Sequence, residues 1–133
     1  YGDPVLPSHL NHNPFIWLKR VIEGGNPRHE KIPNDSASMI HLRDLAKIFL
    51  AVYENPNASG RYFGVYKSLH WYDIYNECRK LIPNMNMPIT FSDKPVEPTG
   101  FDFTRRDSLK VHIRDFSTTL KETINWLKSK PFE

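Results

Sequence analysis

Residues 38–49 read SMIHLRDLAKIF, and residues 53–62 read YENPNASGRY. The first stretch predicts a short strand that continues directly into a helix. Four apolar side chains at helical spacing predict the buried face of that helix: Leu45, Ile48, Phe49 and Val52. The second stretch is a turn with Pro and Gly, and it leads to a second predicted strand over residues 61–66. We therefore expect a strand, a helix, a turn and a strand at the centre of the fold.

Two polar residues of this stretch have predicted places. Asp44 falls in the first turn of the helix, where a carboxylate meets free backbone N–H groups and the positive end of the helix dipole. His41 alternates with Ile40 and Leu42, so its side chain leaves the opposite side of the strand. We interpret His41 as a packing residue in preference to a cleft-lining one. We expect neither residue to be catalytic.

The sequence predicts several further elements. Asn13 and Pro14 open a helix, since Asn caps well and Pro suits the first turn, and Gly24 and Gly25 end it. A helix is predicted over residues 71–82, with Cys78 on its buried face as an inert thiol.

The C-terminal third predicts two short elements and a final helix. A short strand is expected over 88–91 and a short helix near 107–112. The final helix is expected to begin at Thr118 or Thr119, with Glu122 completing a capping box. Together these elements make a small α/β unit, of mixed α+β character as an isolated piece.

Composition excludes several classes of protein. Of the 133 residues, 39% are hydrophobic and 25% charged, as in ordinary globular domains. The net charge of +3 is scattered, which does not indicate a nucleic-acid partner. No apolar run approaches the roughly 20 residues that span a membrane. The single cysteine excludes an internal disulfide and indicates a reducing, cytoplasmic setting.

We expect the chain to be a single unit, 1–133, and a fragment of a longer protein. It opens on YGDP without Met, and the predicted strand over 61–66 has few candidate partners. That strand resembles the edge of a sheet whose centre is missing. An uncovered edge favours self-association, so we also expect a homo-oligomer.

Within the chain, no set of residues predicts catalysis or metal binding. His9 and His12 have a spacing seen in metal sites, but they lie in a loop without a third ligand nearby. The serines lack the G-x-S-x-G context of hydrolases, and no P-loop or G-x-G-x-x-G turn follows a strand.

Several motifs in order resemble the C-terminal half of the extended short-chain dehydrogenase/reductases, in the NAD-dependent epimerase/dehydratase superfamily. The match rests on MIHLRDLA at 39–46, on the turn at 53–62 and on FSTTLKETI at 116–124. The opening YGDPVLP resembles the family's "GP…P" segment, with Asp3 interrupting the Gly-Pro pair. The subgroup that the motifs resemble most is that of dihydroflavonol reductase and cinnamoyl-CoA reductase.

The resemblance implies the substrate-binding lobe of a Rossmann-type reductase, with the Rossmann core largely absent. It implies NADP as cofactor and a carbonyl or acyl-CoA compound as substrate. The family's Gly-rich cofactor turn is absent here, and no Tyr is followed by Lys four residues later, so the catalytic Tyr-x-x-x-Lys pair is absent too. No catalytic residue is therefore carried over. The missing Rossmann half is the expected partner.

The resemblance does carry over residues of the ligand-facing loops. Pro4 and Pro7 match prolines of the loop that faces the cofactor. The positions that match substrate-binding segments are Asn11, Asn13, Pro14 and Ser38.

The sequence thus predicts the substrate-binding portion of an NADP-dependent reductase, catalytically incomplete by itself. The alternative is a non-catalytic protein, either a pseudo-enzyme or an interaction module that reuses this lobe.

Overall fold

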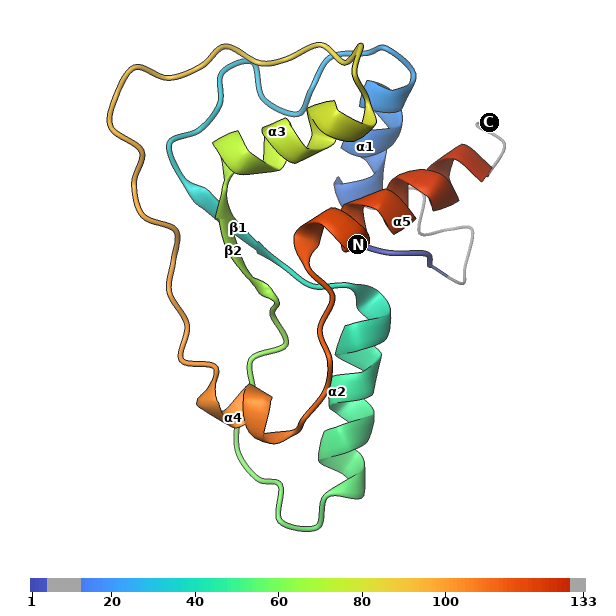
Figure 1. Ribbon diagram of the computed structural model, residues 1–133, viewed down its shortest axis with the longest axis vertical. Coiled ribbons are helices and arrows are strands. Elements are labelled where there is room, and N and C mark those ends of the chain that lie inside the picture. Colours follow the sequence, from blue (N-terminus) through green and yellow to red (C-terminus); the bar gives the residue numbers. More distant parts are fainter. Residues whose placement is uncertain (5–12, 130–133) are drawn as a thin grey trace.

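The computed structural model describes residues 1–4 and 13–129 (Figure 1). In chain order its elements are α1 (Asn13–Ile22), β1 (Ser36–Met39), α2 (Leu42–Glu54), β2 (Lys67–His70), α3 (Trp71–Leu81), α4 (Thr104–Ser108) and α5 (Phe116–Ser129). None of these helices is long and apolar enough to cross a membrane. The mixture of helix and strand agrees with the predicted fold class.

The main core lies among α1, α3 and α5, which gather at one end of the molecule (Figure 1). Tyr75, Cys78 and Leu18 have no exposed surface. Aromatic rings link the helices: the ring of Trp17 on α1 lies 5.9 Å from that of Tyr75 on α3. Phe15 on α1 lies 5.7 Å from Trp126 on α5. Each helix places its apolar stripe inward, as its spacing predicts.

The sheet of the described residues is a two-stranded antiparallel pair, β1 with β2. Ser36 pairs with His70, and Met39 pairs with Lys67. The predicted strand over 61–66 is wrong, since β2 begins at Lys67. Among the described residues no strand pairs with 61–65, and only the Tyr66 N–H reaches β1, where it donates to the Met39 carbonyl oxygen at 2.7 Å. The Arg106 guanidinium donates to the carbonyl oxygens of Val65 and Tyr66 at 2.6 and 2.7 Å.

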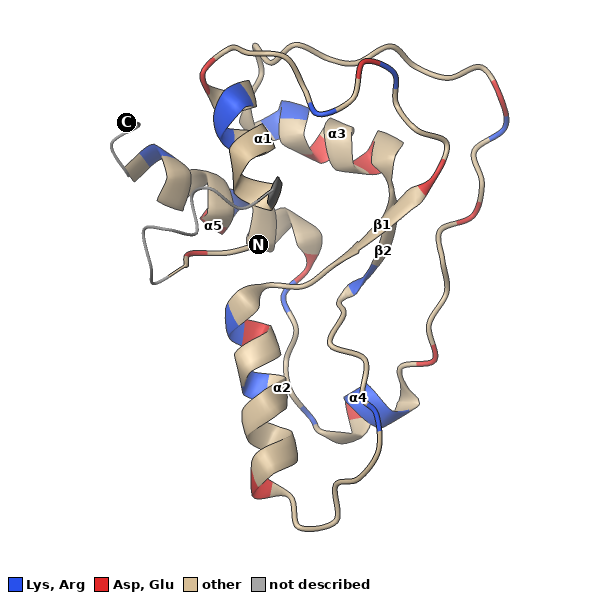
Figure 2. Ribbon diagram, turned by 180° about the vertical axis from the view of Figure 1, so that it is seen from behind, with Lys and Arg blue, Asp and Glu red and all other residues tan. Residues whose placement is uncertain are grey.

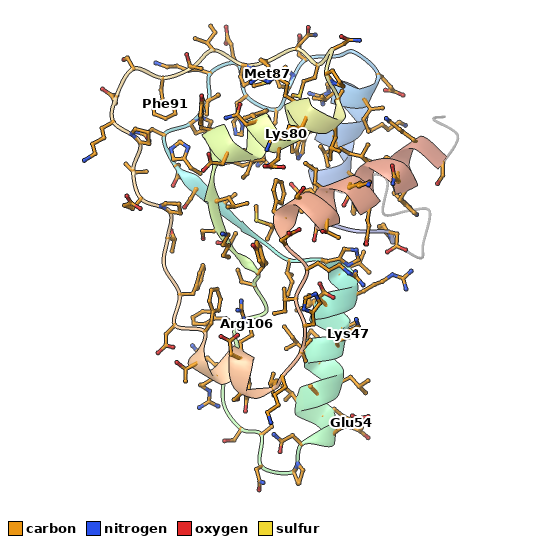
Figure 3. The ribbon with its side chains drawn as sticks, in the orientation of Figure 1. Lys47, Glu54, Lys80, Met87, Phe91 and Arg106 are labelled. Carbon is orange, nitrogen blue, oxygen red and sulfur yellow. The ribbon has the colours of Figure 1, made fainter. Side chains whose placement is uncertain are left out.

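The strand predicted over 88–91 is reduced to one parallel bridge. Ile89 pairs with Lys31, and its backbone exchanges hydrogen bonds of 2.8 and 2.9 Å with Ile32 and Glu30. The long segment between Ile89 and α4 runs along one side of the β1–β2 pair. Figure 3 labels Met87 and Phe91 near its start and Arg106 at its end.

Helix α2 stands apart from the other long helices and extends toward α4 (Figure 1). Ile48 is buried and Leu45 and Val52 are half-buried, in agreement with the predicted inner face. Phe49 does not follow the prediction, because 70% of its surface is exposed. No element among the described residues covers this part of the helix.

Histidines cap two of the helices. The Nδ1 atom of His41 accepts from the backbone N–H of Arg43 at 3.1 Å and starts α2. His70 does the same for α3, where its Nδ1 accepts from Tyr72 N–H at 3.0 Å. The expectation that Asp44 meets the free N–H groups of its own helix is wrong. The imidazole of His41 already fills that place.

The start of α5 also differs from the prediction. Asp115 caps this helix, since its Oδ1 accepts from the backbone N–H of Thr118 at 2.8 Å. The helix therefore begins at Phe116, and Glu122 does not complete the predicted capping box. The short helix predicted near 107–112 lies slightly earlier, as α4.

Lys110, which follows α4, is the one described residue other than glycine with a positive φ, at 54°. This left-handed conformation costs an L-residue roughly 1–2 kcal/mol, whereas Gly adopts it freely. We predict that Lys110→Gly raises the free energy of unfolding by about 0.5–1 kcal/mol after the extra entropy of unfolded Gly is subtracted. Urea denaturation measures the difference. Lys121→Gly, on the exposed side of α5, is the control and should lower stability by about 1 kcal/mol. A loss of stability in both variants would contradict the prediction.

Candidate functional site

Three of the six predicted ligand-binding residues have described side chains. Pro4 is buried, Pro14 is half-buried and Ser38 is exposed. Pro7 and Asn11 lie outside the described residues, as do His9 and His12. Asn13 is the first residue of α1, as predicted.

The segment Tyr1–Pro4 is held where three helices meet. Leu42 at the start of α2 donates its N–H to the carbonyl oxygen of Tyr1 at 2.9 Å. Gly2 donates its N–H to Thr123 Oγ1 of α5 at 2.7 Å. The Tyr1 ring lies 6.4 Å from that of Phe15, in the first turn of α1. The structure therefore brings the segment of Pro4 to the helix turn that holds Asn13 and Pro14.

Ser38 belongs to a different part of the molecule. It lies on β1, and its Oγ is 2.7 Å from Ser68 Oγ on β2. This distance fits the close approach of side chains at a non-hydrogen-bonded pair of an antiparallel ladder. The described bond of Ser38 thus joins β1 to β2 and does not run toward Pro4.

A group of charged and polar side chains connects the Tyr1–Pro4 segment to α2 and α5. We call it the His41 cluster, and its members are Asp3, His41, Asp44, Arg114 and Glu122. His41 Nδ1 lies 2.7 Å from Arg114 Nη1, and His41 Nε2 lies 2.7 Å from Glu122 Oε2. Because Nδ1 accepts from two donors, the proton of the neutral ring belongs on Nε2. The Nε2–Glu122 contact is close, but its N–H is not aligned for a hydrogen bond.

Asp44 is the buried carboxylate of the His41 cluster, with no exposed surface. Its Oδ2 accepts from the backbone N–H of Arg114 at 2.8 Å. Its Oδ1 lies 3.9 Å from Arg114 Nη1 and 4.0 Å from Lys47 Nζ, within ion-pair range. The cluster therefore joins the start of α2 to the segment that leads into α5. Only tertiary structure could show this, because its members are spread from Asp3 to Glu122.

Asp3 also forms an ion pair at the surface. Both of its carboxylate oxygens accept from Arg43, at 2.8 and 2.6 Å. This hydrogen bonding holds the pKa of Asp3 below its usual value. The Arg43 guanidinium, which contacts the Tyr1–Pro4 segment through Asp3, is thus already paired with a carboxylate.

Burial, assisted by the Arg114 cation, lowers the pKa of His41 below its usual value of 6.5, against the opposing effect of Glu122. A lowered folded-state pKa means that folding favours the neutral ring. This stability is complete above the unfolded-state pKa and is lost as the pH falls from about 6.5 through the folded-state value.

We predict that the free energy of unfolding decreases between pH 7 and pH 5 and that His41→Asn makes this decrease smaller. Asn keeps a cap acceptor for Arg43 N–H but does not titrate. Urea denaturation at several pH values measures the slope. Burial also lowers the pKa of His29, so the variant should retain part of the pH dependence. The prediction fails if both proteins have the same slope.

Gly2 fits closely against the His41 ring. Its φ is 115°, and a Cβ added there would lie 2.7 Å from His41 Cε1. We predict that Gly2→Ala lowers the free energy of unfolding by about 2 kcal/mol or more, from backbone strain and overlap together. Gly24→Ala is the matched control, because Gly24 also has a positive φ, 84°, but nothing lies within 4 Å of the added Cβ. It should cost about 1 kcal/mol. Equal losses would show that the contact with His41 contributes nothing.

The sequence did not reveal an open groove of about 700 Å³ between α3, β2 and the start of α5. Lys80, which Figure 3 labels on α3, contributes to one wall. The other residues that line it are Tyr66, Lys67, Leu69, Tyr72, Asp73, Asn76, Glu77, Arg79, Asp115, Phe116 and Ser117. Three cationic side chains and three carboxylates line it, so the groove does not favour ligands of one charge. The helical spacing of residues 72, 73, 76, 79 and 80 is the signal that could have found it.

The described residues contain no group of three His, Cys, Asp or Glu side chains that could hold a metal ion. Cys78 is buried, as predicted, and burial raises the pKa of its thiol to about 12. A thiol with this pKa is not a nucleophile at neutral pH. Lys, Arg, Asp and Glu are interspersed along the chain (Figure 2).

Known proteins were compared with this chain. It is 30% identical over 131 residues to cinnamoyl-CoA reductase CAD2 of Medicago truncatula, covering 97% of this chain and 39% of that protein. It is 30% identical to cinnamoyl-CoA reductase 1 of Petunia hybrida, covering 96% and 38%. Dihydroflavonol 4-reductase of Dianthus caryophyllus is 30% identical over 96 residues, 63% of this chain and 25% of that protein. No family model matches.

The fold is also found in a longer solved chain. The structure named SsCR has a TM-score of 0.69 at 19% identity, covering 97% of this chain and 41% of that one. The fold and these relatives place the chain with the extended short-chain dehydrogenase/reductases, as their C-terminal part. Within that class its relatives are the cinnamoyl-CoA reductases and dihydroflavonol reductase, as the sequence motifs predicted. The chain spans about two-fifths of the length of these relatives.

Proposed function

We propose that this chain is the substrate-binding portion of an NADP-dependent reductase that acts on a carbonyl or acyl-CoA compound. The observation that carries the proposal is the similarity of almost the whole chain to part of several cinnamoyl-CoA reductases. The chain contains no Tyr-x-x-x-Lys pair, so hydride transfer needs residues from the rest of a longer protein. A second lobe over a nucleotide-binding sheet closes the cleft and excludes water.

The geometry of the Tyr1–Pro4 segment supports this role. Backbone hydrogen bonds to α2 and α5 fix its position, and Gly2 packs on His41. In the proposal this rigid anchor presents Pro4, and Pro7 beyond it, to the cofactor. Asn11, Asn13 and Pro14 contact substrate near the start of α1, and Ser38 contacts it from β1.

We infer that the described residues do not form a complete NADP site by themselves. Arg43, next to the anchored segment, is paired with Asp3 through two hydrogen bonds and is not free for a phosphate. The chain has no Gly-rich turn after a strand. We therefore propose that the rest of the cofactor site comes from the missing Rossmann half, in the cytoplasm, where a free thiol such as Cys78 stays reduced.

The absence of the catalytic pair also favours a second candidate, a non-catalytic pseudo-enzyme or interaction module. The two proposals differ in the protein's coding sequence. A Gly-rich βαβ unit and Tyr-x-x-x-Lys in frame before Tyr1 support the reductase, whereas a start codon near Tyr1 supports the module.

We predict that the purified chain does not oxidise NADPH in the presence of cinnamoyl-CoA and binds NADPH weakly or not at all. Absorbance of NADPH measures turnover, and isothermal titration calorimetry measures binding. Cinnamoyl-CoA itself should bind, and Ser38→Trp should weaken that binding by about tenfold. Ser129→Trp, on α5, is the control and should leave the affinity unchanged. Sustained NADPH oxidation by the chain alone would overturn the proposal.

A further inference from the structure

The segment between Ile89 and α4 is long, and residues 90–103 contain no helix or strand. A connection of this length in a compact fold is often a lid or a binding loop. Among the described residues, its backbone from 92 to 102 takes part in no backbone–backbone hydrogen bond. Its attachment to the rest of the molecule therefore depends on side chains.

Both ends of this segment are fixed by aromatic packing. At its start, the Phe91 ring, labelled in Figure 3, lies 5.1 Å from the imidazole of His70 on β2. At its end, the Phe101 ring lies 4.9 Å from that of Phe63. We call the part between these two anchors, residues 92–100, the strap.

The side chain of Asn34 binds the middle of the strap through two hydrogen bonds. Its Oδ1 accepts from the backbone N–H of Val96 at 2.9 Å, and its Nδ2 donates to the carbonyl oxygen of Lys94 at 3.0 Å. The amide thus binds one donor and one acceptor of the strap backbone, as a neighbouring strand would. Ser36 adds a further bond, because its Oγ accepts from the backbone N–H of Thr99 at 3.1 Å.

The orientation of the Asn34 amide is fixed by His70. The Nδ1 atom of His70 accepts from Tyr72 N–H as the cap of α3, so the proton of the neutral ring lies on Nε2. This Nε2–H donates to Asn34 Oδ1, which is 2.9 Å away. The amide oxygen therefore faces His70 and Val96, and the amide nitrogen is left for the carbonyl oxygen of Lys94. One chain of hydrogen bonds joins the helix cap to the strap.

The strap is attached to the face of β1 that carries Ser38. Ser36 and Ser38 are two residues apart on β1, so their side chains leave the same face of the strand. The two positions are about 7 Å apart along the strand. In the proposed function Ser38 contacts substrate. The strap, which is bonded at Ser36, then lies beside that substrate.

We propose that the strap is a movable wall of the substrate site and that Asn34 is the clasp that holds it closed beside Ser38. The role toward substrate rests on the proposed function, whereas the clasp rests on the hydrogen bonds of Asn34. Packing fixes the two ends of the strap, and side-chain hydrogen bonds hold its middle. Such bonds are individually weak, so the middle can open while the ends stay in place. Asn34 is a positioning residue for substrate and not a catalytic one.

Amide hydrogen exchange of the full chain, followed by NMR, tests the clasp. The Val96 and Thr99 amides should exchange more slowly than in an unstructured peptide. Asn34→Ala should speed up exchange at Val96 by about three- to tenfold, and at Thr99 too, because the strap opens as a unit. The Ile89 amide, which donates to the Glu30 carbonyl oxygen at 2.9 Å before the strap begins, should exchange at an unchanged rate.

Two further variants sharpen this test. Asn34→Asp keeps an acceptor for Val96 N–H but has no donor for the Lys94 carbonyl oxygen, so it should speed up exchange less than Asn34→Ala does. Asn57→Ala is the matched control, because it removes an exposed amide in the turn after α2, and it should change nothing. Exchange at Ile89 that rises as much as at Val96 would show a general loss of stability and overturn the clasp. A Val96 amide without protection in the unmodified chain would also overturn it.

Cinnamoyl-CoA tests the movable wall. Its binding should slow exchange at Val96 and Thr99 by about threefold or more, and Asn34→Ala should raise its dissociation constant by about three- to tenfold. Asn57→Ala should leave that constant unchanged. Binding that alters neither the exchange nor the constant overturns the movable wall, while the proposed function stands. If the unmodified chain does not bind cinnamoyl-CoA, the proposed function and the wall fail together, and exchange in the free chain still decides whether Asn34 is the clasp.

Discussion

Gly2 packs against the imidazole of His41, and this contact ties together the first residues, α2 and the approach to α5. A side chain at residue 2 would overlap the ring, and the positive φ of Gly2 suits glycine alone. The same imidazole accepts the first free N–H of α2 and contacts Arg114 and Glu122. One buried ring thereby fixes the first residues, the start of α2 and the approach to α5. Burying it in the neutral form makes this junction sensitive to acid.

The junction separates two parts of unequal completeness. The helices α1, α3 and α5 bury their apolar faces against one another and form a closed core. Helix α2 is attached at its N-terminal end through His41 and Asp44, while its apolar second half remains mostly uncovered. Because helix stability comes mainly from the packing of apolar faces, the far end of α2 is where this chain depends most on a partner.

The relation to the reductases accounts for this imbalance. Nearly all of the chain matches relatives that are about two and a half times as long, given the 39% of Medicago truncatula CAD2 that it covers. The segment 61–66 has the composition of a strand, yet among the described residues only Tyr66, at its end, bonds to a strand, through its N–H to Met39 of β1. The carbonyl oxygens of Val65 and Tyr66 turn instead to Arg106. A strand pattern without a neighbouring strand cannot form a ladder, whatever its propensity.

The helices with clear apolar periodicity, α1, α3 and α5, and the burial of Cys78 were predictable from the sequence. The sequence also determined the family, through motifs whose order matters more than any one of them. Two local helix caps differ from the prediction, and contacts between distant residues are seen in the folded chain alone. Asp44 lies in the first turn of α2, as predicted, but His41 caps the helix, and the Asp44 carboxylate accepts from the backbone N–H of Arg114. Glu122 does not complete the predicted capping box, because Asp115 caps α5. The strand after the turn moved to residues 67–70, where β1 supplied a partner. Local patterns record propensities, whereas hydrogen bonds between residues distant in sequence form only once the chain has folded.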